Sequence, residues 1–213
     1  MVWVTLKNKE IKDMGQQKIL SNVDILIEYW KSKGYKGQHD ASFNIYGGLI
    51  AFWGSMDAED LGNGMFARRT FTFFEDTWSM YFTMFMDTTM KKPVYQFHGE
   101  GFFEVESPSS VVEGAYNVMF GFHRKTIRLL TSNKQVISSL GFDDCGLKLS
   151  IVKDISGTGC SFIKSVKDYE QEYDLLKLDA TAKILRLGAR PADGDMSTEA
   201  RRPTTLGIPL KKL

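Results

Sequence analysis

The amino-acid sequence predicts an all-β fold: a single closed antiparallel β-barrel of about 8–10 strands, preceded by an N-terminal amphipathic helix. Three observations carry this prediction: apolar and polar residues alternate with a period of two after Gly37, turn signals divide that region into strand-length pieces, and a helical period occurs near the N-terminus. With 213 residues the chain is long enough for one domain with a well-buried core. We therefore expect an N-terminal extension, residues 1–36, and a barrel domain, residues 37–213.

The helix is predicted over residues 19–33. Its apolar residues recur at steps of three and four and its charged residues fall on the other side; the apolar positions are Ile19, Val23, Leu26, Ile27 and Trp30. Ser21 stands where an N-terminal cap belongs, and Gly34 where a C-terminal cap belongs.

The strands follow in the order of the chain. Their predicted ranges are 45–56, 65–74, 77–86, 94–104, 115–122, 126–130, 147–154, 172–178 and 183–187, with a short helix at 133–140. Hairpin-length links between them indicate an antiparallel meander. Closing such a sheet on itself removes its exposed edges, and a barrel of this size leaves room for one small ligand, so the natural interpretation is a lipocalin-like barrel.

The composition excludes several classes of protein. Because 27 basic residues are balanced by 26 acidic ones, no long-range field attracts nucleic acid. The sequence contains no continuous apolar run of membrane-spanning length and begins without a secretory pattern, so we expect no membrane span and a cytoplasmic location. Aromatic residues make up 13% of the chain and indicate a wide apolar interior.

One face of the predicted strand 77–86 is strongly apolar and should point inward. It carries Trp78, Met80, Phe82, Met84 and Met86. Methionine is flexible and polarisable, so this stripe could mould itself around an apolar ligand. The same stripe also suits a barrel that simply fills its core, and the pattern favours this second interpretation.

Polar residues in the strands give the candidates for chemistry. His98 and Glu100 share one face of the strand 94–104 and could form an acid and base pair if that face lined a cavity. The aromatic residues of the opposite face favour an outward, solvated position for the pair. Of Arg68 and Arg69, one must point to the side of the neighbouring Phe residues, either in a structural ion pair or as a ligand anchor. The candidate ion-pair partners are Glu59, Glu172 and Asp154.

We expect neither a metal nor a cofactor. Cys145 and Cys160 match no zinc or redox spacing, and His39 and His123 lack nearby acidic or Cys partners. No nucleophile elbow, phosphate loop or zinc-protease motif occurs. Whether the two cysteines form a disulfide stays open.

Five blocks of the chain, taken in order, resemble a known family. They are FWGSMDAEDLGNGMFARRTFTF (52–73), PVYQFHGEGFF (93–103), CGLKLSIVKDISGTGC (145–160), EYDLLKLD (172–179) and GARPADGDMSTEARRPTTLGIPL (188–210). The chain from about residue 49 onward is similar to the lipocalin-like domain of the adenomatosis polyposis coli down-regulated family, whose animal members are secreted or membrane-tethered Wnt antagonists. The last block is the most specific.

The resemblance implies a closed or nearly closed barrel with an apolar pocket for a lipid-like moiety. The motif places are occupied by Trp53, Arg69, Pro93, Gly101, Asp154, Cys160, Tyr173, Arg190, Pro191, Asp193, Gly194 and Arg202. Cys145 and Cys160 match one cysteine pair of the family, whereas Ala58 and Met90 stand where the other pair is expected. Together with the absent secretory pattern, the missing pair argues against extracellular Wnt antagonism for this chain.

The last block also has a structural interpretation from its residues. Pro191 and Gly194 can fix turns, Asp193 can cap local amides, and Arg190 and Arg202 can pair with carboxylates of the barrel. We predict an ordered clasp across a barrel opening.

The leading functional hypothesis is a non-catalytic barrel that binds a small apolar or lipid-like molecule. Its predicted lining is Trp53, Phe71, Phe73, Trp78, Met80, Phe82, Met84 and Tyr116. One alternative is a barrel enzyme, a cyclase, isomerase or hydrolase of an apolar metabolite, assisted by an acid or base; the candidates are His98, Glu100, Arg69 and Tyr116. A second alternative is a protein-interaction module, in which residues 19–33 dock on a partner or on a second copy.

Overall fold

The computed structural model describes Ile45 and residues 47–213. The predicted helix at 19–33, and with it the docking role of the N-terminal extension, lies outside the described residues. The compact unit that contains the strands spans Gly48–Leu213.

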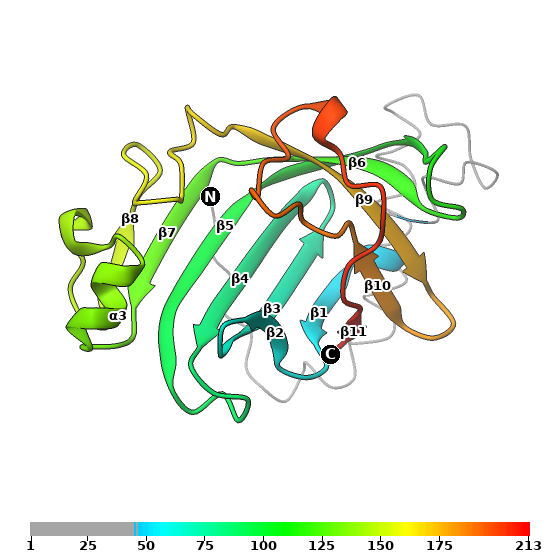
Figure 1. The fold of residues 1–213 in the computed structure, drawn as a ribbon. Coiled ribbons are helices and arrows are strands. Elements are labelled where there is room, and N and C mark those ends of the chain that lie inside the picture. The colour runs from blue at the N-terminus through cyan, green and yellow to red at the C-terminus, as the bar shows by residue number, and fades with distance from the viewer. Residues whose placement is uncertain (1–44, 46) are drawn as a thin grey trace, which may run out of the picture. The chain divides into compact units, whose positions relative to one another are not determined.

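Eight strands close into an antiparallel barrel, which confirms the predicted all-β class and the closure of the sheet (Figure 1). They are β1 (Ala51–Ser55), β3 (Met65–Phe74), β4 (Thr77–Phe85), β5 (Pro93–Pro108), β6 (Tyr116–Gly121), β9 (Gln171–Asp179), β10 (Ile184–Leu187) and β11 (Leu210–Lys212). Neighbours pair in the order β1-β3-β4-β5-β6-β9-β10-β11, and β11 pairs with β1 to complete the ring.

Three further strands lie outside the ring. The strand β2 (Glu59–Gly62) pairs with the first part of β3, while β7 (Arg124–Leu129) and β8 (Val152–Asp154) extend the sheet from the first half of β5. The strands β7 and β8, the helix α3 (Lys134–Ser139) and the single turn η2 (Asp143–Cys145) build what we call the side lobe, residues 124–165. The side chain of Asn133 caps α3 by accepting hydrogen bonds from the N–H groups of Gln135 and Val136.

The predicted strands need four corrections. The range 147–154 contains only the three-residue strand β8, Val152–Asp154, and β2, Glu59–Gly62, forms where no strand was predicted. The range 45–56 is not one strand, because residues 47–49 are helical and β1 starts only at Ala51; a short apolar run does not distinguish helix from strand by its period. The strand β11, which closes the ring, falls in a region where no strand was predicted. Its three residues, LKK, are too few to show an alternation.

The strand β5 serves both the barrel and the side lobe. Its first half pairs with β7 through Tyr95–Glu100 and its second half pairs with β6 from Phe103 onward. β6 and β7 therefore follow one another along the edge of β5 that is not paired with β4, and the register changes by one residue between them. At this change of register a Cβ atom at Gly101 would lie 2.0 Å from the carbonyl oxygen of Gly121. The indole N–H of Trp78 donates to that same oxygen at 3.1 Å, which holds it in place.

An aromatic cluster fills the end of the barrel at which β1 begins, called the closed end below. Trp53 and Phe73 are each 1% exposed, and Phe120 is 2% exposed. Ring centroids lie 5.2 Å apart between Phe73 and Phe103 and 4.9 Å apart between Trp78 and Phe120. The indole N–H of Trp53 donates to the carbonyl oxygen of Leu49 at 2.9 Å.

We expect Gly101→Ala to destabilise the barrel by about 3 kcal/mol, because the new methyl group overlaps a backbone oxygen that is held by Trp78. Urea unfolding followed by circular dichroism measures the change. Gly157→Ala is the matched control, since a Cβ atom there meets nothing within 4 Å. Equal stability of the two variants would show that β5 and the β6 exit can separate freely.

Candidate functional site

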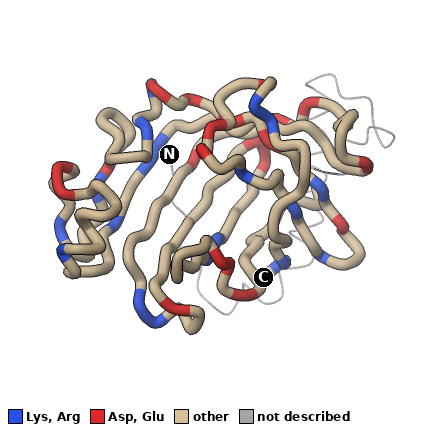
Figure 2. The backbone as a smooth tube through the Cα atoms, viewed as in Figure 1, with Lys and Arg blue, Asp and Glu red and all other residues tan. Residues whose placement is uncertain are grey.

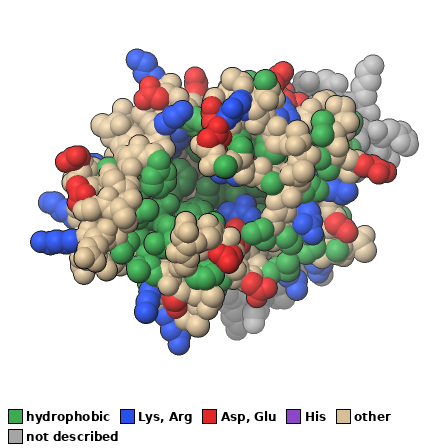
Figure 3. Space-filling model, viewed as in Figure 1, with side chains coloured by type: hydrophobic (Ala, Val, Ile, Leu, Met, Phe, Trp, Pro, Cys, Tyr) green, Lys and Arg blue, Asp and Glu red, His purple; other side chains and the backbone are tan. Residues whose placement is uncertain are grey.

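The other end of the barrel, called the open end below, is only partly filled. The strand register aligns Arg69, Phe82 and Phe97 across β3, β4 and β5, and Met80 lies next to this row on the inward side. All four residues are half-buried, in contrast to the aromatic cluster at the closed end. Figure 3 shows a hollow that is lined mostly by hydrophobic side chains and contains basic and acidic atoms.

A small polar group stands at the open end. The guanidinium of Arg69 points inward and its Nε donates to both carboxylate oxygens of Glu59, at 2.8 and 3.0 Å. The hydroxyl of Ser55 donates to Glu59 Oε1 at 2.8 Å, and the Ser55 Oγ atom accepts from the backbone N–H of Arg69 at 2.7 Å. The short strand β2 positions Glu59, which thus proves to be the partner of Arg69 among the three carboxylates that the sequence suggested.

A second group of inward-facing acids lies on β9. Glu172 is opposite Phe120 in the register and pairs with Arg190. Asp174 is opposite Val118 and accepts hydrogen bonds from the N–H groups of Leu175 and Gly188, at 2.7 and 2.9 Å. Burial raises the pKa of Asp174 to about 7, and the nearby Glu172 carboxylate also raises it, whereas the two backbone hydrogen bonds lower it. The Glu172 carboxylate is the main reason why the pKa of Arg190 is raised.

Lys125 is a buried cation whose hydrogen bonds are already used. It is 2% exposed, and its ammonium donates to the carbonyl oxygens of Lys164, Ser165 and Tyr169 at 3.2, 3.2 and 2.8 Å. It also lies 4.4 Å from the ring centroid of Phe122. Burial lowers the pKa of Lys125 to about 8. Three donors with three acceptors leave this ammonium no hydrogen for a ligand.

The predicted lining residues fall into three places. Trp53, Phe71, Phe73 and Trp78 belong to the closed end, where their packing fills the core. Met84 is buried against the side lobe, and Tyr116 lies on the inward face near the closed end. Met80 and Phe82 are half-buried on the inward face at the open end, next to Arg69 in the register. Phe97 was not predicted as a lining residue, although its place on the aromatic face of the strand 94–104 was the available signal.

Of the four acid and base candidates, only His98 and Glu100 lie close together, and they lie on the outer face. The His98 Nε2 atom is 3.8 Å from a Glu100 oxygen, and the centroids of the His98 and Tyr81 rings are 4.3 Å apart in a stacked arrangement. Burial lowers the pKa of His98. Arg69 is at the open end and Tyr116 near the closed end, so none of the four forms an acid and base pair on the inward face of the described barrel.

The segment 188–209 loops over the viewer-facing side of β6 and β9 in Figure 1 and is held by ion pairs. Arg190 pairs with Glu172, Asp193 with Arg201, and Arg202 with Glu106. The Arg202 Nη1 atom also donates to the carbonyl oxygens of Val118 and Asp174, at 2.8 and 2.6 Å. These bonds tie the segment 188–209, called the clasp below, to both β6 and β9.

A cavity of about 440 Å³ opens in the clasp itself, lined by Pro191, Ala192, Asp193, Ala200, Arg201 and Arg202. It is distinct from the hollow of the barrel. Because its arginines are already paired with carboxylates, we assign it no ligand.

Basic and acidic residues are interspersed along the whole described backbone (Figure 2).

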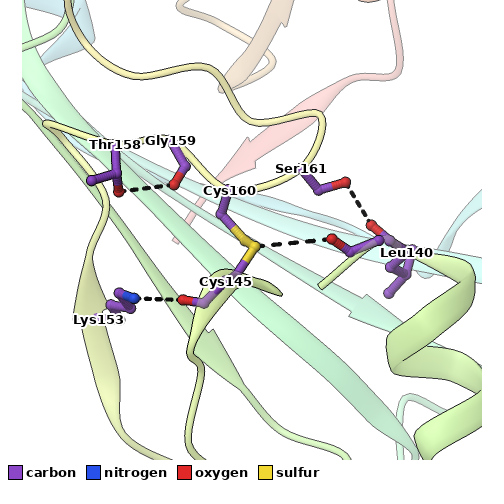
Figure 4. The surroundings of a disulfide bond; sticks show 8 residues. Leu140, Cys145, Lys153, Thr158, Gly159, Cys160 and Ser161 are labelled. Carbon is purple, nitrogen blue, oxygen red and sulfur yellow. Dashed lines mark hydrogen bonds between the residues drawn. A yellow bond between two sulfur atoms is a disulfide. The ribbon is translucent and has the colours of Figure 1, made fainter. Parts of the chain in front are cut away.

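The side lobe is closed by a disulfide bond between Cys145 and Cys160 (Figure 4), which answers the question that the sequence left open. Hydrogen bonds flank it: the Lys153 ammonium donates to the carbonyl oxygen of Cys145 at 2.5 Å, and the Ser161 hydroxyl to that of Leu140 at 2.7 Å. The bond joins η2 to the loop after β8 and so encloses the buried residues Phe142 and Ile155.

Comparison of the chain with protein-family models finds no match. Comparison with curated proteins finds no match either. Within the described part of the chain, no helix is long and apolar enough to cross a bilayer. Residues 45 and 47–213 also contain no group of three or more His, Cys, Asp or Glu side chains placed to hold a metal ion.

The raised pKa of Asp174 makes a prediction for stability against pH. The pKa of Asp174 in the folded protein, about 7, lies above the ordinary value of 3.8. The neutral carboxyl group therefore makes its full contribution to stability below about pH 4, and this contribution is lost as the pH rises through 7. Asp174→Asn stays neutral and keeps an oxygen for both N–H donors. We expect the wild-type protein to lose about 2–3 kcal/mol relative to this variant between about pH 5 and pH 8.

Chemical unfolding at the two pH values measures the difference. Asp57→Asn is the control, because Asp57 is exposed in a turn. Parallel stability curves for Asp174→Asn and the wild type would contradict the proposed titration.

The disulfide closes a loop with a sequence separation of 15 residues, for which chain entropy gives about 3 kcal/mol. We expect the double variant Cys145→Ser, Cys160→Ser to lose roughly that stability and to exchange its amide hydrogens faster in residues 142–163. The strands β1 and β3 should keep their protection. Adding reductant to the wild-type protein should reproduce the effect, and unchanged exchange after reduction would contradict it.

Proposed function

We propose that the protein binds a small apolar or lipid-like molecule in the open end of the barrel. The observation that carries this proposal is the half-buried row of inward-facing apolar side chains, Met80, Phe82 and Phe97, beside a hollow in a closed barrel. Ligand sites of this kind are concave, mostly apolar, and contain few polar groups. The polar group of Ser55, Glu59 and Arg69 fits that pattern.

The filled closed end limits where such a ligand can lie. Trp53, Phe73 and Phe120 occupy the interior there, so the ligand contacts the open end and the adjoining side of the side lobe. Met65, Phe82 and Phe97 pack against the buried core of the side lobe, which makes that lobe one wall of the site. Methionine supports this role because its flexible side chain adapts to an irregular apolar surface.

We also propose that the chain is a divergent relative of the lipocalin-like domain of the adenomatosis polyposis coli down-regulated family. The closed eight-strand barrel and the bond between Cys145 and Cys160 support this relationship. So do the ion pairs of Arg190 and Arg202, which stand in the block that most resembles the family.

The cytoplasmic location stays a prediction, and the disulfide argues for an oxidising compartment instead, since such bonds are rare in a reducing cytosol. Alkylation of cells before lysis decides between the two. Free Cys145 and Cys160 thiols support the cytoplasm, and blocked ones an oxidising compartment.

Met80→Trp should abolish binding of an apolar ligand, because the larger side chain fills the hollow. Purified wild-type protein should carry a hydrophobic molecule that native mass spectrometry detects and solvent extraction removes, and the stripped protein should take up the neutral dye Nile red. Ser79→Trp is the matched control, since it adds the same ring to the outward face of β4. The proposal fails if the wild-type protein copurifies with no hydrophobe and binds no dye, or if Ser79→Trp and Met80→Trp bind equally.

A further inference from the structure

Arg69 stands where the polar end of a ligand would meet the barrel. Its guanidinium carbon is 6.0 Å from the ring centroid of Phe71, at the boundary between the aromatic cluster and the open end. Phe82 lies opposite it on β4. The side chain of Arg69 is 20% exposed, whereas that of its partner Glu59 is 6% exposed, so a molecule in the hollow can reach the guanidinium but hardly the carboxylate.

The guanidinium retains hydrogen-bond donors. Of its five N–H groups, the Nε group goes to Glu59, and Nη2 donates one bond to the carbonyl oxygen of Ile208 at 3.3 Å. In the part of the chain that the structure describes, Nη1 contacts no acceptor. Because the guanidinium is charged and only 20% of the Arg69 side chain is exposed, a ligand oxygen that accepts from Nη1 would add a stabilising hydrogen bond there.

The charge of Arg69, however, is already balanced. Glu59 faces it at 2.8 Å in a buried setting, and a carboxylate brought to Nη1 would be a second negative charge beside the same guanidinium. Lys125, another inward-facing cation, is enclosed by carbonyl oxygens and is out of reach of a ligand. Glu172 is matched by Arg190. The hollow therefore offers hydrogen bonds without an excess of positive charge.

Resting on the ligand site proposed above, we infer that the bound molecule is a neutral amphipath, whose hydroxyl, ester or carbonyl oxygen accepts a hydrogen bond from Arg69 while its hydrocarbon part lies against Met80, Phe82 and Phe97. A free fatty acid is disfavoured by the charge of Glu59. Specificity here is a difference in affinity produced by a repulsive element as well as by an attractive one.

Competition against Nile red with two compounds of equal chain length, dodecan-1-ol and dodecanoate, tests the inference at about pH 8. We expect the alcohol to displace the dye from wild-type protein at a concentration at least about tenfold lower than the carboxylate. Only the dye signal that is absent from Met80→Trp is counted, because that signal reports binding in the hollow. Dodecanoate competing as well as the alcohol, or better, would overturn the inference.

Two variants give the sharper test. Glu59→Gln removes the negative charge and leaves an amide for Ser55 and Arg69, so the preference should shift toward dodecanoate by about tenfold or more. Arg69→Met removes the donor and should weaken the alcohol by about tenfold while Nile red still binds. Arg68→Gln is the matched control on the outer face of β3 and should change neither value.

The outcomes separate the two proposals. If the wild-type protein binds neither the dye nor either compound, the ligand site itself is wrong. If the dye binds in the hollow but Glu59→Gln leaves the ratio unchanged, only the inference on the head group is wrong. Circular dichroism verifies the fold of each variant. If Glu59→Gln does not fold, the test rests on Arg69→Met. Alcohol binding by Arg69→Met that equals the wild type would then overturn the inference on the head group and leave the proposed ligand site standing.

Discussion

The structure depends on one long strand, β5, which links the barrel and the side lobe. β4 pairs with one edge of β5, while β7 and β6 pair in turn with the other edge, and the change between them occurs at Gly101, where a side chain would meet the carbonyl oxygen of Gly121. On the inward face before this point, Phe97 and its neighbour Phe82 stay half-buried. The same strand therefore carries Phe97 at the open end and Phe103 in the aromatic cluster of the closed end.

Two ion pairs hold inward-facing charges in place, whereas Asp174 and Lys125 are held by backbone groups. Arg69 and Glu59 face each other across β2 and β3, and Glu172 of β9 meets Arg190 from the clasp. Removing one member of such a pair leaves a buried charge without compensation, which costs more than the pair contributes. This makes the polar positions of the interior less tolerant of change than the apolar ones that surround them.

The sequence predicted the class of fold well because long alternating strands such as β3 and β4 carry a clear period of two. It missed β11, whose three residues show no period, and it could not place the exchange of partners at Gly101, which is a tertiary event. For the site, Trp78, Met80, Phe82, Met84 and Met86 were predicted to face inward. The first four do so, whereas Met86 lies beyond the end of β4 and is 39% exposed, so that part of the prediction is wrong. The division of the stripe into fully buried and half-buried residues could not be foreseen, since it depends on what packs against each position in the tertiary structure. The sequence left two candidates for the inward arginine, Arg68 and Arg69, and three candidates for its carboxylate partner. It could not choose among them because partners that are distant in the sequence leave no local signal.

The ring of eight strands has a consequence for how such a protein can change over time. The aromatic cluster fills the closed end, where Trp53 and Trp78 donate hydrogen bonds to backbone oxygens, and it lies apart from the half-buried residues of the open end. Under the proposed function, substitutions at Met80, Phe82 or Phe97 would alter what is bound while the fold is retained, which is the general condition for one fold to host many functions. Proteins descended from a common barrel can therefore differ in ligand while they keep the same fold, and sequence similarity between them should persist longest at the closed end.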